Sequence, residues 1–382
     1  MKRRGKRFLL FERNVPGGLC RTNEIDGFRF DRGGHFIHSK SDYVRNFVRY
    51  ILPDIEEHKR KAYIYFRNRL IPYPIQSNLP GMRFEERLFS TFSYMFRGGE
   101  KKLNLESSFY KTFGRFLSEK FFIPYNSKLW QYPLNYMTTN GIGRYIPKPN
   151  LFGFHSDSGY NPVFLFPRRG IGELTEKLSN DIKWNKGELR EIRKGKVKIG
   201  NNTYKYKKLV LTIPLPDVIK LLAKEDSGGI KEKLRYVSIM VINIGFDGYT
   251  PVPFHWVYFP DERFPFIRAG SFSNISSSMA PDGYSSLWLE VPFTGRKPIN
   301  IIDDAIDMLI STGIVKGKVI FSSYDILEYA YVIFDREREG ILKKIKMILD
   351  KYNIILAGRF AEWEYTTMGY SIQRGKELAE KI

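Results

Sequence analysis

With 382 residues, 42% hydrophobic and 15% aromatic, the chain can bury large cores in two or three domains, which excludes an intrinsically disordered protein. Its 62 Lys and Arg residues against 41 acids give a formal charge of +21, but they are spread along the chain, so phosphorylated small molecules or anionic lipid fit better as partners than nucleic acid. A single cysteine, five scattered histidines and the lack of an apolar run near about 18 residues argue against an intramolecular disulfide, a metal site and a membrane span, and predict a cytoplasmic protein.

The first predicted element is a buried strand over residues 7–12, "RFLLFE", which ends at the acid Glu12. A turn with Gly17 and Gly18 follows, and "GFRFDRGGHFIH" then alternates as strand, turn and strand. In a dinucleotide-binding βαβ unit, an acid at this place binds a ribose hydroxyl, about 20 residues after a glycine-rich phosphate loop. Adjacent glycines let the backbone approach a ligand, and their amides can bind phosphate oxygens. The opening segment therefore has the chemistry of a nucleotide site, although no such loop precedes Glu12.

The middle of the chain alternates between strands and helices. Apolar spacing predicts a helix over residues 42–52, strands at "AYIYF" and "LIPYPIQ", and mainly helices over residues 85–140. Pro72 and Pro74 confine the second of these strands to a sheet edge or a loop. "GIGELTEKL" predicts a further helix, and "KVKIGNNTYKYKKLVLTIP" predicts a hairpin followed by a buried strand that ends at Pro214.

Strands dominate residues 237–331, with one helix near residues 301–310. The chain then returns to a helix over residues 338–349, a buried strand "NIILAG" and a final helix. Buried strands near both ends, separated by helical and β-rich stretches, predict one α/β domain that is assembled from separate segments.

Several ordered stretches resemble the FAD-dependent flavoprotein family that includes amine oxidases, protoporphyrinogen oxidases and UDP-galactopyranose mutases. The strand with Glu12 and its glycine turn resemble the flavin-binding segment, and "IILAGRFAEWEYTTMGYSIQRGKELAEKI" resembles the closing strand and helix. Between the two ends the resemblance narrows to the UDP-galactopyranose mutases, particularly the eukaryotic type. The matching stretches, collinear over most of the chain, are "IPYPIQSN", "PYNSKLWQYPLNYM", "FLFPRRGIGEL", "WVYFPDERFPFIRAGSFSN", "WLEVPFTGRKPIN" and "EYAYVIFDREREG".

The resemblance implies an α/β fold with a Rossmann-like FAD-binding domain assembled from discontinuous segments, a helical insertion and an antiparallel β-sheet domain. In that family a strand and a Gly-x-Gly-x-x-Gly loop come before the stretch with which this chain starts, so we expect these elements to be missing from a truncated sequence. Residues 1–40, 165–232 and 338–382 are assigned to the FAD-binding domain. Residues 41–164 are expected to form a mainly helical substrate-side domain, and residues 233–337 an antiparallel β-sheet substrate domain.

The resemblance also implies a flavin-dependent isomerase that interconverts UDP-galactopyranose and UDP-galactofuranose for cell-surface glycan biosynthesis. In that family reduced FAD attacks the anomeric carbon, UDP leaves, and a flavin–sugar adduct opens and recloses as the five-membered ring. The expected partners are FAD and a UDP-sugar, without nucleic acid, metal or integral membrane association, and a homo-oligomer stays open.

The site residues carried over from the family motifs fall into three groups. Arg268, Arg144 and His35 are expected to be catalytic, with the arginines beside the sugar diphosphate and His35 beside the flavin. The expected substrate-binding residues are Tyr73, Gln76, Asn126, Trp130, Tyr258, Tyr331 and Tyr365. The expected cofactor-binding residues are Glu12, Gly17, Gly18, Leu19, Thr22, Gly33, Gly34, Arg359 and Met368.

Two alternatives to the mutase stay open. Residues 366–370, "TTMGY", stand where the family usually has an Asn and an Asp-His run, which leaves room for an FAD-dependent oxidoreductase of the amine oxidase, protoporphyrinogen oxidase or desaturase kind. Such an oxidase would need an apolar substrate cavity with few arginines, so Arg144 and Arg268 favour the mutase. A non-enzymatic basic protein is the more distant alternative, and it predicts cations on one continuous face with salt-sensitive binding.

Overall fold

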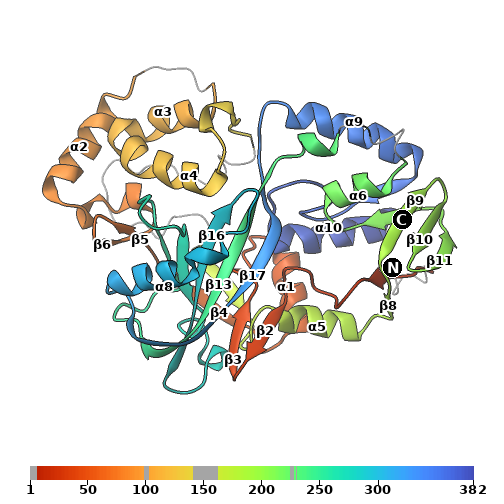
Figure 1. Ribbon diagram of the computed structural model, residues 1–382, viewed down its shortest axis with the longest axis horizontal. Helices are drawn as coiled ribbons and strands as arrows, with labels where there is room; N and C mark the ends of the chain where they lie inside the picture. Colours follow the sequence, from red (N-terminus) through yellow and green to blue (C-terminus); the bar gives the residue numbers. More distant parts are fainter. Residues whose placement is uncertain (1–6, 99–102, 141–161, 224–227, 229) are drawn as a thin grey trace.

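The computed structural model describes residues 7–98, 103–140, 162–223, 228 and 230–382. A seven-stranded sheet forms its centre, and it is antiparallel except where β14 runs parallel to β5 (Figure 1). Its strands in spatial order are β17 (Lys316–Val332), β13 (Tyr236–Tyr249), β16 (Tyr284–Phe293), β15 (Arg268–Ser271), β14 (Trp256–Tyr258), β5 (Ala62–Phe66) and β6 (Arg69–Pro72). Strands from two of the predicted domain segments thus share one sheet, and the division into domains stays a prediction.

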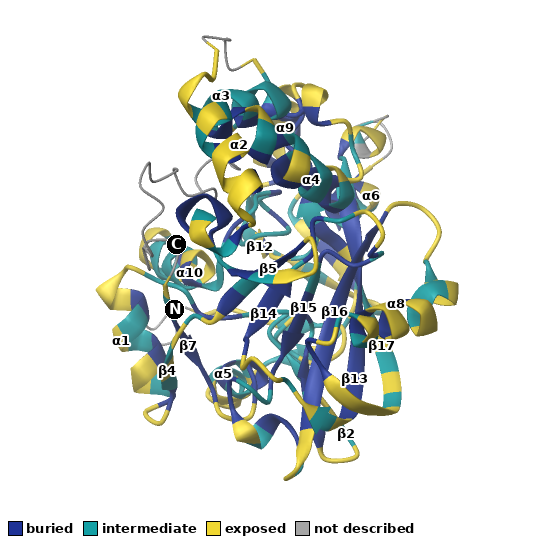
Figure 2. Ribbon diagram, turned by 90° about the vertical axis from the view of Figure 1, so that its left-hand side faces the viewer, coloured by how far each residue is buried: buried dark blue, intermediate teal, exposed yellow. Residues whose placement is uncertain are grey.

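The two faces of this sheet bury separate hydrophobic cores, because side chains alternate along each strand. On β13, Ile239 and Val241 belong to one core, and Met240 and Ile242 belong to the other. Every residue of the β13 run "VSIMVINIGF" is buried (Figure 2). A strand covered on both faces needs such a continuous apolar run, and α8 (Ile302–Ser311) supplies part of the cover on the second face.

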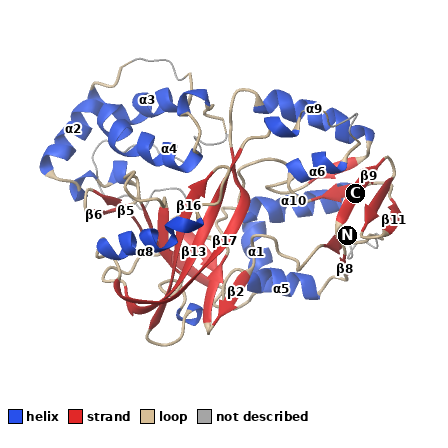
Figure 3. Cartoon of the chain, in the orientation of Figure 1, coloured by secondary structure: helices blue, strands red, loops and turns tan. Residues whose placement is uncertain are grey.

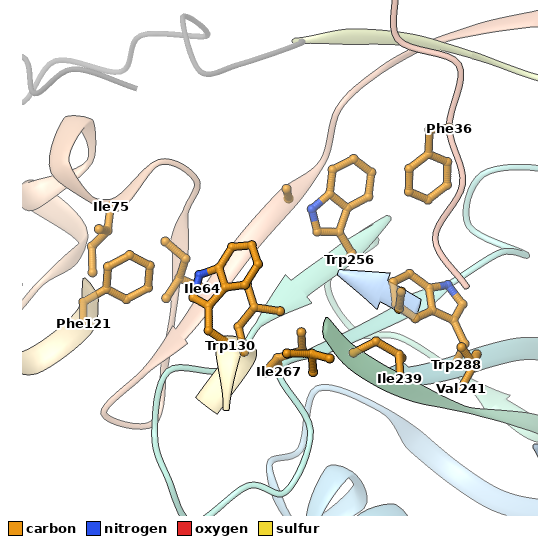
Figure 4. Packing of buried hydrophobic residues seen from close by; sticks show 14 of the residues in the cluster. Phe36, Ile64, Ile75, Phe121, Trp130, Ile239, Val241, Trp256, Ile267 and Trp288 are labelled. Carbon is orange, nitrogen blue, oxygen red and sulfur yellow. The ribbon is translucent and has the colours of Figure 1, made fainter. Parts of the chain in front are cut away.

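A helical layer covers the first core at one end of the sheet. It consists of α2 (Phe84–Met95), α3 (Leu105–Leu117), the π-helical turn η4 (Ser118–Phe122) and α4 (Ile123–Trp130). Phe113 and Phe122 stack there with their ring centroids 3.8 Å apart. Trp130 of α4 extends this aromatic packing toward Ile267, the residue before β15 (Figure 4).

A second, α/β part of the molecule carries most of the parallel strand pairs (right-hand side of Figure 3). There β12 (Leu209–Leu211) pairs in parallel with β18 (Ile354–Leu356), and β1 (Phe11–Glu12) pairs in parallel with β8 (Asn185–Lys186). Its other elements are β9 (Leu189–Arg193), β10 (Lys196–Ile199), β11 (Asn202–Lys205), α6 (Leu215–Leu221), α9 (Arg338–Lys351) and α10 (Met368–Lys381). Segments from the start, middle and end of the chain therefore meet here, as the sequence predicts.

The elements between these two parts complete the fold. They are the hairpin β2 (Thr22–Ile25) and β3 (Phe28–Asp31), the pair β4 (Glu56–Lys59) and β7 (Val163–Phe166), and the helices α1 (Asp42–Ile51) and α5 (Gly172–Asn180). The bounds of α1, α8 and α9 agree with the predicted helices to within about two residues, as helix ends normally do. The prediction that "LIPYPIQ" lies at a sheet edge or in a loop is confirmed, because β6 is the last strand of the central sheet and ends at Pro72.

The predicted buried strand over residues 7–12 is wrong in its length and in its burial. Only the two residues of β1 are paired, and the apolar side chains of residues 8–10 are exposed. Within the described ranges, β1 has a sheet partner on one side only, and residues 8–10 precede its paired residues. Residues 8–10 instead line the large cavity described below.

Asp31, buried at the end of β3, ties the hairpin to the N-terminus of α5. Its carboxylate accepts hydrogen bonds from Thr22 Oγ1 at 2.6 Å and from the backbone N of Ile171 at 3.0 Å. Burial raises the pKa of Asp31 to about 7, against the smaller opposite effect of these hydrogen bonds.

We expect the protein to become easier to unfold as the pH rises from about 4 to 7, because over that range Asp31 is ionised in the unfolded chain but still protonated in the folded protein. Its folded-state pKa of about 7 lies above the ordinary 3.8, so this stabilisation is complete below the ordinary value and is lost as the pH rises through 7. Urea titrations of the Asp31→Asn variant should lack this slope, which amounts to at most about 1.4 kcal/mol per pH unit. Parallel pH curves for the two proteins would contradict the assignment.

Candidate active site

A cavity of about 3180 Å³ lies where the central sheet meets the α/β part of the molecule. Its wall combines the turn after β1, the loop after β3, side chains of β14 to β17, and α10. Pockets for a single small ligand usually measure about 300–1,000 Å³, so this cavity has room for more than one.

The turn after β1 brings bare backbone to the cavity. Gly17 has a φ of +122°, and a Cβ there would lie 2.8 Å from Thr175 Oγ1, so only glycine fits. Gly18 also has a positive φ, and no atom lies within 4 Å of the place where its Cβ would be. Glu12 ends β1 beside the turn, and its carboxylate accepts the backbone N–H of Asn14 at 3.0 Å. An acid at the end of such a strand can bind a ribose hydroxyl, and an open glycine turn lets backbone amides approach phosphate oxygens.

Two buried polar atoms of uncharged side chains in the cavity wall carry no hydrogen bond within the described part of the chain. They are the indole Nε1 of Trp256 and the Oγ1 of Thr366. Trp256 is held by stacking on Phe36, with 4.7 Å between the ring centroids (Figure 4). Because buried donors and acceptors normally find partners, these two atoms fit a wall that binds a ligand.

Arg268 of β15 projects into the cavity and is held by Glu290, its cross-strand partner on β16. Arg268 Nη2 donates to Glu290 Oε1 at 2.6 Å, and Nε donates to Oε2 at 3.0 Å. The backbone N of Gly34 donates to the same Oε1 at 3.2 Å. Burial lowers the pKa of Arg268, but Glu290 more than offsets this and holds it well above the ordinary value, so the guanidinium stays charged.

His35 follows Gly33 and Gly34 in the loop after β3. Its Nδ1 lies 3.2 Å from the carbonyl oxygen of Gly33, which can only accept, so Nδ1 carries the proton. Burial, and then the charge of Arg359, lowers the pKa of His35 to about 4. The imidazole is therefore neutral at physiological pH.

Tyrosines and a second arginine complete the wall. Tyr73 packs on Tyr258 with 5.2 Å between their ring centroids, and Tyr331 packs on Tyr365 with 5.4 Å. The guanidinium of Arg359 lies 4.5 Å from the ring centroid of Tyr365. Burial raises the pKa of Tyr73, Tyr331 and Tyr365, so their hydroxyls are neutral and can donate hydrogen bonds.

The structure brings most of the predicted site residues to this one cavity. Those in its wall are Glu12, Gly17, Gly18, Leu19, Gly34, His35, Tyr73, Tyr258, Arg268, Tyr331, Arg359, Tyr365 and Met368. Gly33 lies directly behind the wall, because a Cβ there would be 3.3 Å from Glu290 Oε1. Arg144 lies outside the described residues. The roles assigned to all these residues stay predictions.

Four predicted residues have other surroundings. The Trp130 indole donates to Asn126 Oδ1 at 3.1 Å, and Asn126 Nδ2 donates to the carbonyl oxygen of Phe122 at 2.7 Å, so both side chains are satisfied within α4 and its N-terminal flank. Gln76 is buried away from the wall, and Thr22 is occupied by its bond to Asp31 described above. Trp130 nevertheless touches the cavity indirectly, since its ring packs 5.9 Å from the Tyr331 ring.

Glu290, Arg60 and His38 are among the residues of the wall to which the sequence motifs did not point. Glu290 could have been found, because a lone acid in the apolar strand "LWLEVPF" must have a buried partner. Arg60, which lies 4.7 Å over the ring of Tyr73, stands in the charged run "HKRK" and carries no such signal. His38 follows His35 at a spacing of three, but only its position in the wall distinguishes it.

Comparisons with known proteins agree with this geometry. A family model described as an NAD(P)-binding Rossmann-like domain matches residues 1–51. A solved structure of reduced UDP-galactopyranose mutase is 25% identical, with a TM-score of 0.92, and the match covers 98% of this chain and 88% of that chain. Putrescine oxidase bound to putrescine, at 10% identity and a TM-score of 0.66, and cyclohexylamine oxidase from Brevibacterium oxydans IH-35A, at 11% and 0.68, share the fold; each match covers 100% of this chain and 94% of the other.

The fold and the cavity thus define a flavoenzyme with FAD as its cofactor, similar in fold to UDP-galactopyranose mutase and to amine oxidases. The glycine turn, Glu12 and the two unpartnered wall atoms fit such a group. The fold of the chain is similar to that of UDP-galactopyranose mutase over nearly its whole length, which confirms the predicted fold.

Proposed function

We propose that this flavoenzyme interconverts UDP-galactopyranose and UDP-galactofuranose. The observation that carries the proposal is the charged Arg268, locked by Glu290 among tyrosines and next to the loop of His35. The similarity to reduced UDP-galactopyranose mutase supports it, since that protein shares the fold over nearly the whole chain.

FAD would be held by Glu12 at its ribose, by the Gly17–Gly18 turn and by Arg359 near its phosphates. When bound and reduced, it supplies the nucleophile for the anomeric carbon of the sugar. Gly33, Gly34 and His35 would form the loop beside the flavin ring. Because His35 is neutral at physiological pH, it can offer a hydrogen-bond acceptor at Nε2 without adding charge.

Arg268 would neutralise the diphosphate of UDP as it leaves and returns. Its Nε and Nη2 are oriented by Glu290, and within the described residues Nη1 makes no hydrogen bond, so that edge of the fork can meet a phosphate oxygen. A guanidinium fixed before the substrate arrives needs no reorganisation when charge develops on the leaving group. The hydroxyls of Tyr331 and Tyr365 would add neutral donors on the other side.

The main alternative is an FAD-dependent oxidoreductase, since oxidases share the fold. Three of the arginines in the wall of the cavity, Arg60, Arg268 and Arg359, lie close to its tyrosines. They would repel the ammonium group of an amine substrate and attract a diphosphate, so charge favours a sugar nucleotide.

The test uses the FAD-loaded protein reduced with dithionite and incubated with UDP-galactofuranose. We expect chromatography to show UDP-galactopyranose, and the oxidised enzyme, as the control, to give none. If the flavin-loaded protein forms no pyranose but releases hydrogen peroxide with an amine in air, the oxidoreductase is correct instead. A protein that binds FAD and turns over neither substrate would also contradict the mutase.

A further inference from the structure

The outward face of α2 is apolar and uncovered. Six large aromatic or aliphatic side chains on or next to this helix are 41–77% exposed. They are Phe84, Leu88, Phe89, Phe92, Met95 and Phe96. Figure 2 shows the exposed bands along α2 at one end of the molecule. We call these six residues the α2 face.

The spacing of the sequence places these side chains together. Phe84, Leu88, Phe92 and Phe96 follow one another at intervals of four, so they lie on one side of the helix. The rings of Phe92 and Phe96 stack with 6.3 Å between their centroids. A contiguous exposed apolar stripe of this kind marks an interaction site rather than ordinary surface.

α2 cannot turn this face inward, because its opposite side is already fixed. Glu86 is buried there and pairs with Arg67 at 2.8 Å. Gly114 of α3 has a φ of +75°, and a Cβ on it would overlap the carbonyl oxygen of Ser93, so the two helix backbones are in close contact. The apolar face is therefore a permanent feature of the folded chain.

Arginines stand at both ends of the α2 face. Arg83 and Arg87 lie at its start and Arg97 at its end, and all three are exposed. The Arg87 guanidinium lies 5.4 Å from the ring centroid of Phe84. Within the described part of the chain, none of the three forms an ion pair with an acid, and Glu85 is the one exposed acid of α2.

This charge pattern distinguishes between two occupants of the face. If a second copy packed α2 against α2 in an antiparallel arrangement, Arg83 and Arg87 would face Arg97; in a parallel arrangement each arginine would face its own copy. Like charges across an interface are unfavourable in both cases. Anionic lipid headgroups would instead pair with all three arginines, while phenylalanines enter the boundary between headgroups and acyl chains.

We propose that the α2 face docks the protein on an anionic lipid surface, with the helix lying in the plane of the interface. The aromatic side chains would insert, and the arginines would stretch their apolar stems along the boundary and place their charges at the phosphates. None of the helices in the described ranges is long and apolar enough to cross a bilayer. No residue of the α2 face lines the catalytic cavity.

The experiment is flotation of the FAD-loaded full chain with vesicles of phosphatidylcholine, with and without phosphatidylglycerol. We expect binding to the vesicles that contain phosphatidylglycerol and little binding to phosphatidylcholine alone. Failure to bind the anionic vesicles at low salt would overturn the proposal.

A matched pair of variants separates the α2 face from the general positive charge of the protein. Met95 on α2 and Met347 on α9 are 64% and 61% exposed, so Met95→Asp and Met347→Asp add the same charge at similar helix positions. Met95→Asp should weaken vesicle binding by at least about tenfold, and Met347→Asp by about twofold or less. Equal losses in the two variants would mean diffuse electrostatic binding. A Met95→Asp variant that turns a dimer into a monomer in gel filtration, yet keeps vesicle binding, would assign the face to a second copy.

Discussion

Replacing Arg268 with Lys is expected to lower the turnover of UDP-galactofuranose about a hundredfold, with a smaller effect on substrate affinity. Lysine keeps the positive charge but cannot reproduce the planar fork that grips Glu290 through Nε and Nη2. The lysine ammonium would therefore bind either the Glu290 carboxylate or the diphosphate of UDP, but not both in the present geometry. The measurement is kcat and KM for the dithionite-reduced variant, with FAD content determined on the same sample.

Arg263 provides the matched control, because it lies on the loop that leads into β15 but points into solvent. It is 64% exposed and pairs with Asp261 at 2.9 Å. Arg263→Lys should leave kcat unchanged within about twofold, since exposed ion pairs contribute little. If Arg268→Lys raised only KM, Arg268 would bind the ground state and the transition state alike, and its proposed role in the departure of UDP would be wrong.

The sequence predicts the architecture well where a local pattern decides it. The run "VSIMVINIGF" reads as a strand buried on both faces, and β13 is such a strand. Pro72 predicts an edge position for its strand because proline cannot donate to a ladder, and β6 lies at the edge. These features depend on the period of the side chains and on backbone chemistry, which a single sequence displays directly.

Side-chain pairs that depend on the register between distant strands cannot be predicted from a single sequence in this way. Arg268 and Glu290 become partners only because β15 pairs with β16 in one register; a slip by one residue would send them to opposite faces. In the same way, the apolar run "FLLF" predicts burial, but burial needs other segments to cover the side chains, and residues 8–10 line the cavity instead.

The pair of Asn126 and Trp130 shows a different limit. Their spacing of four residues on a helix could serve either a ligand or each other. In the structure the Trp130 indole N–H donates to the Asn126 side chain. A sequence motif cannot show this, because the same two residues would be present if both side chains bound a ligand. Motifs therefore indicate which residues lie near the cavity, whereas the direction in which each polar group points is decided by packing.

Replacing Glu290 with Gln is expected to lower the free energy of unfolding by about 3 kcal/mol. The side chain of Glu290 is 5% exposed and that of Arg268 is 16% exposed, so the variant leaves a guanidinium buried without its counter-charge. One amide oxygen can still accept from Arg268 or from Gly34, but the amide N–H₂ would oppose the second donor of the fork. Turnover should fall as well, because Arg268 would no longer be held in one orientation.

Urea unfolding of the FAD-loaded proteins measures this loss, and Glu188→Gln is its control. Glu188 pairs with Arg13 at 3.4 Å, and their side chains are 49% and 67% exposed. Removing that charge should change the stability by less than about 1 kcal/mol, because solvent screens the exposed pair. If the two variants lost the same stability, the Arg268–Glu290 pair would be no more tightly coupled than a surface contact, and the rigid guanidinium on which the proposed chemistry depends would not exist.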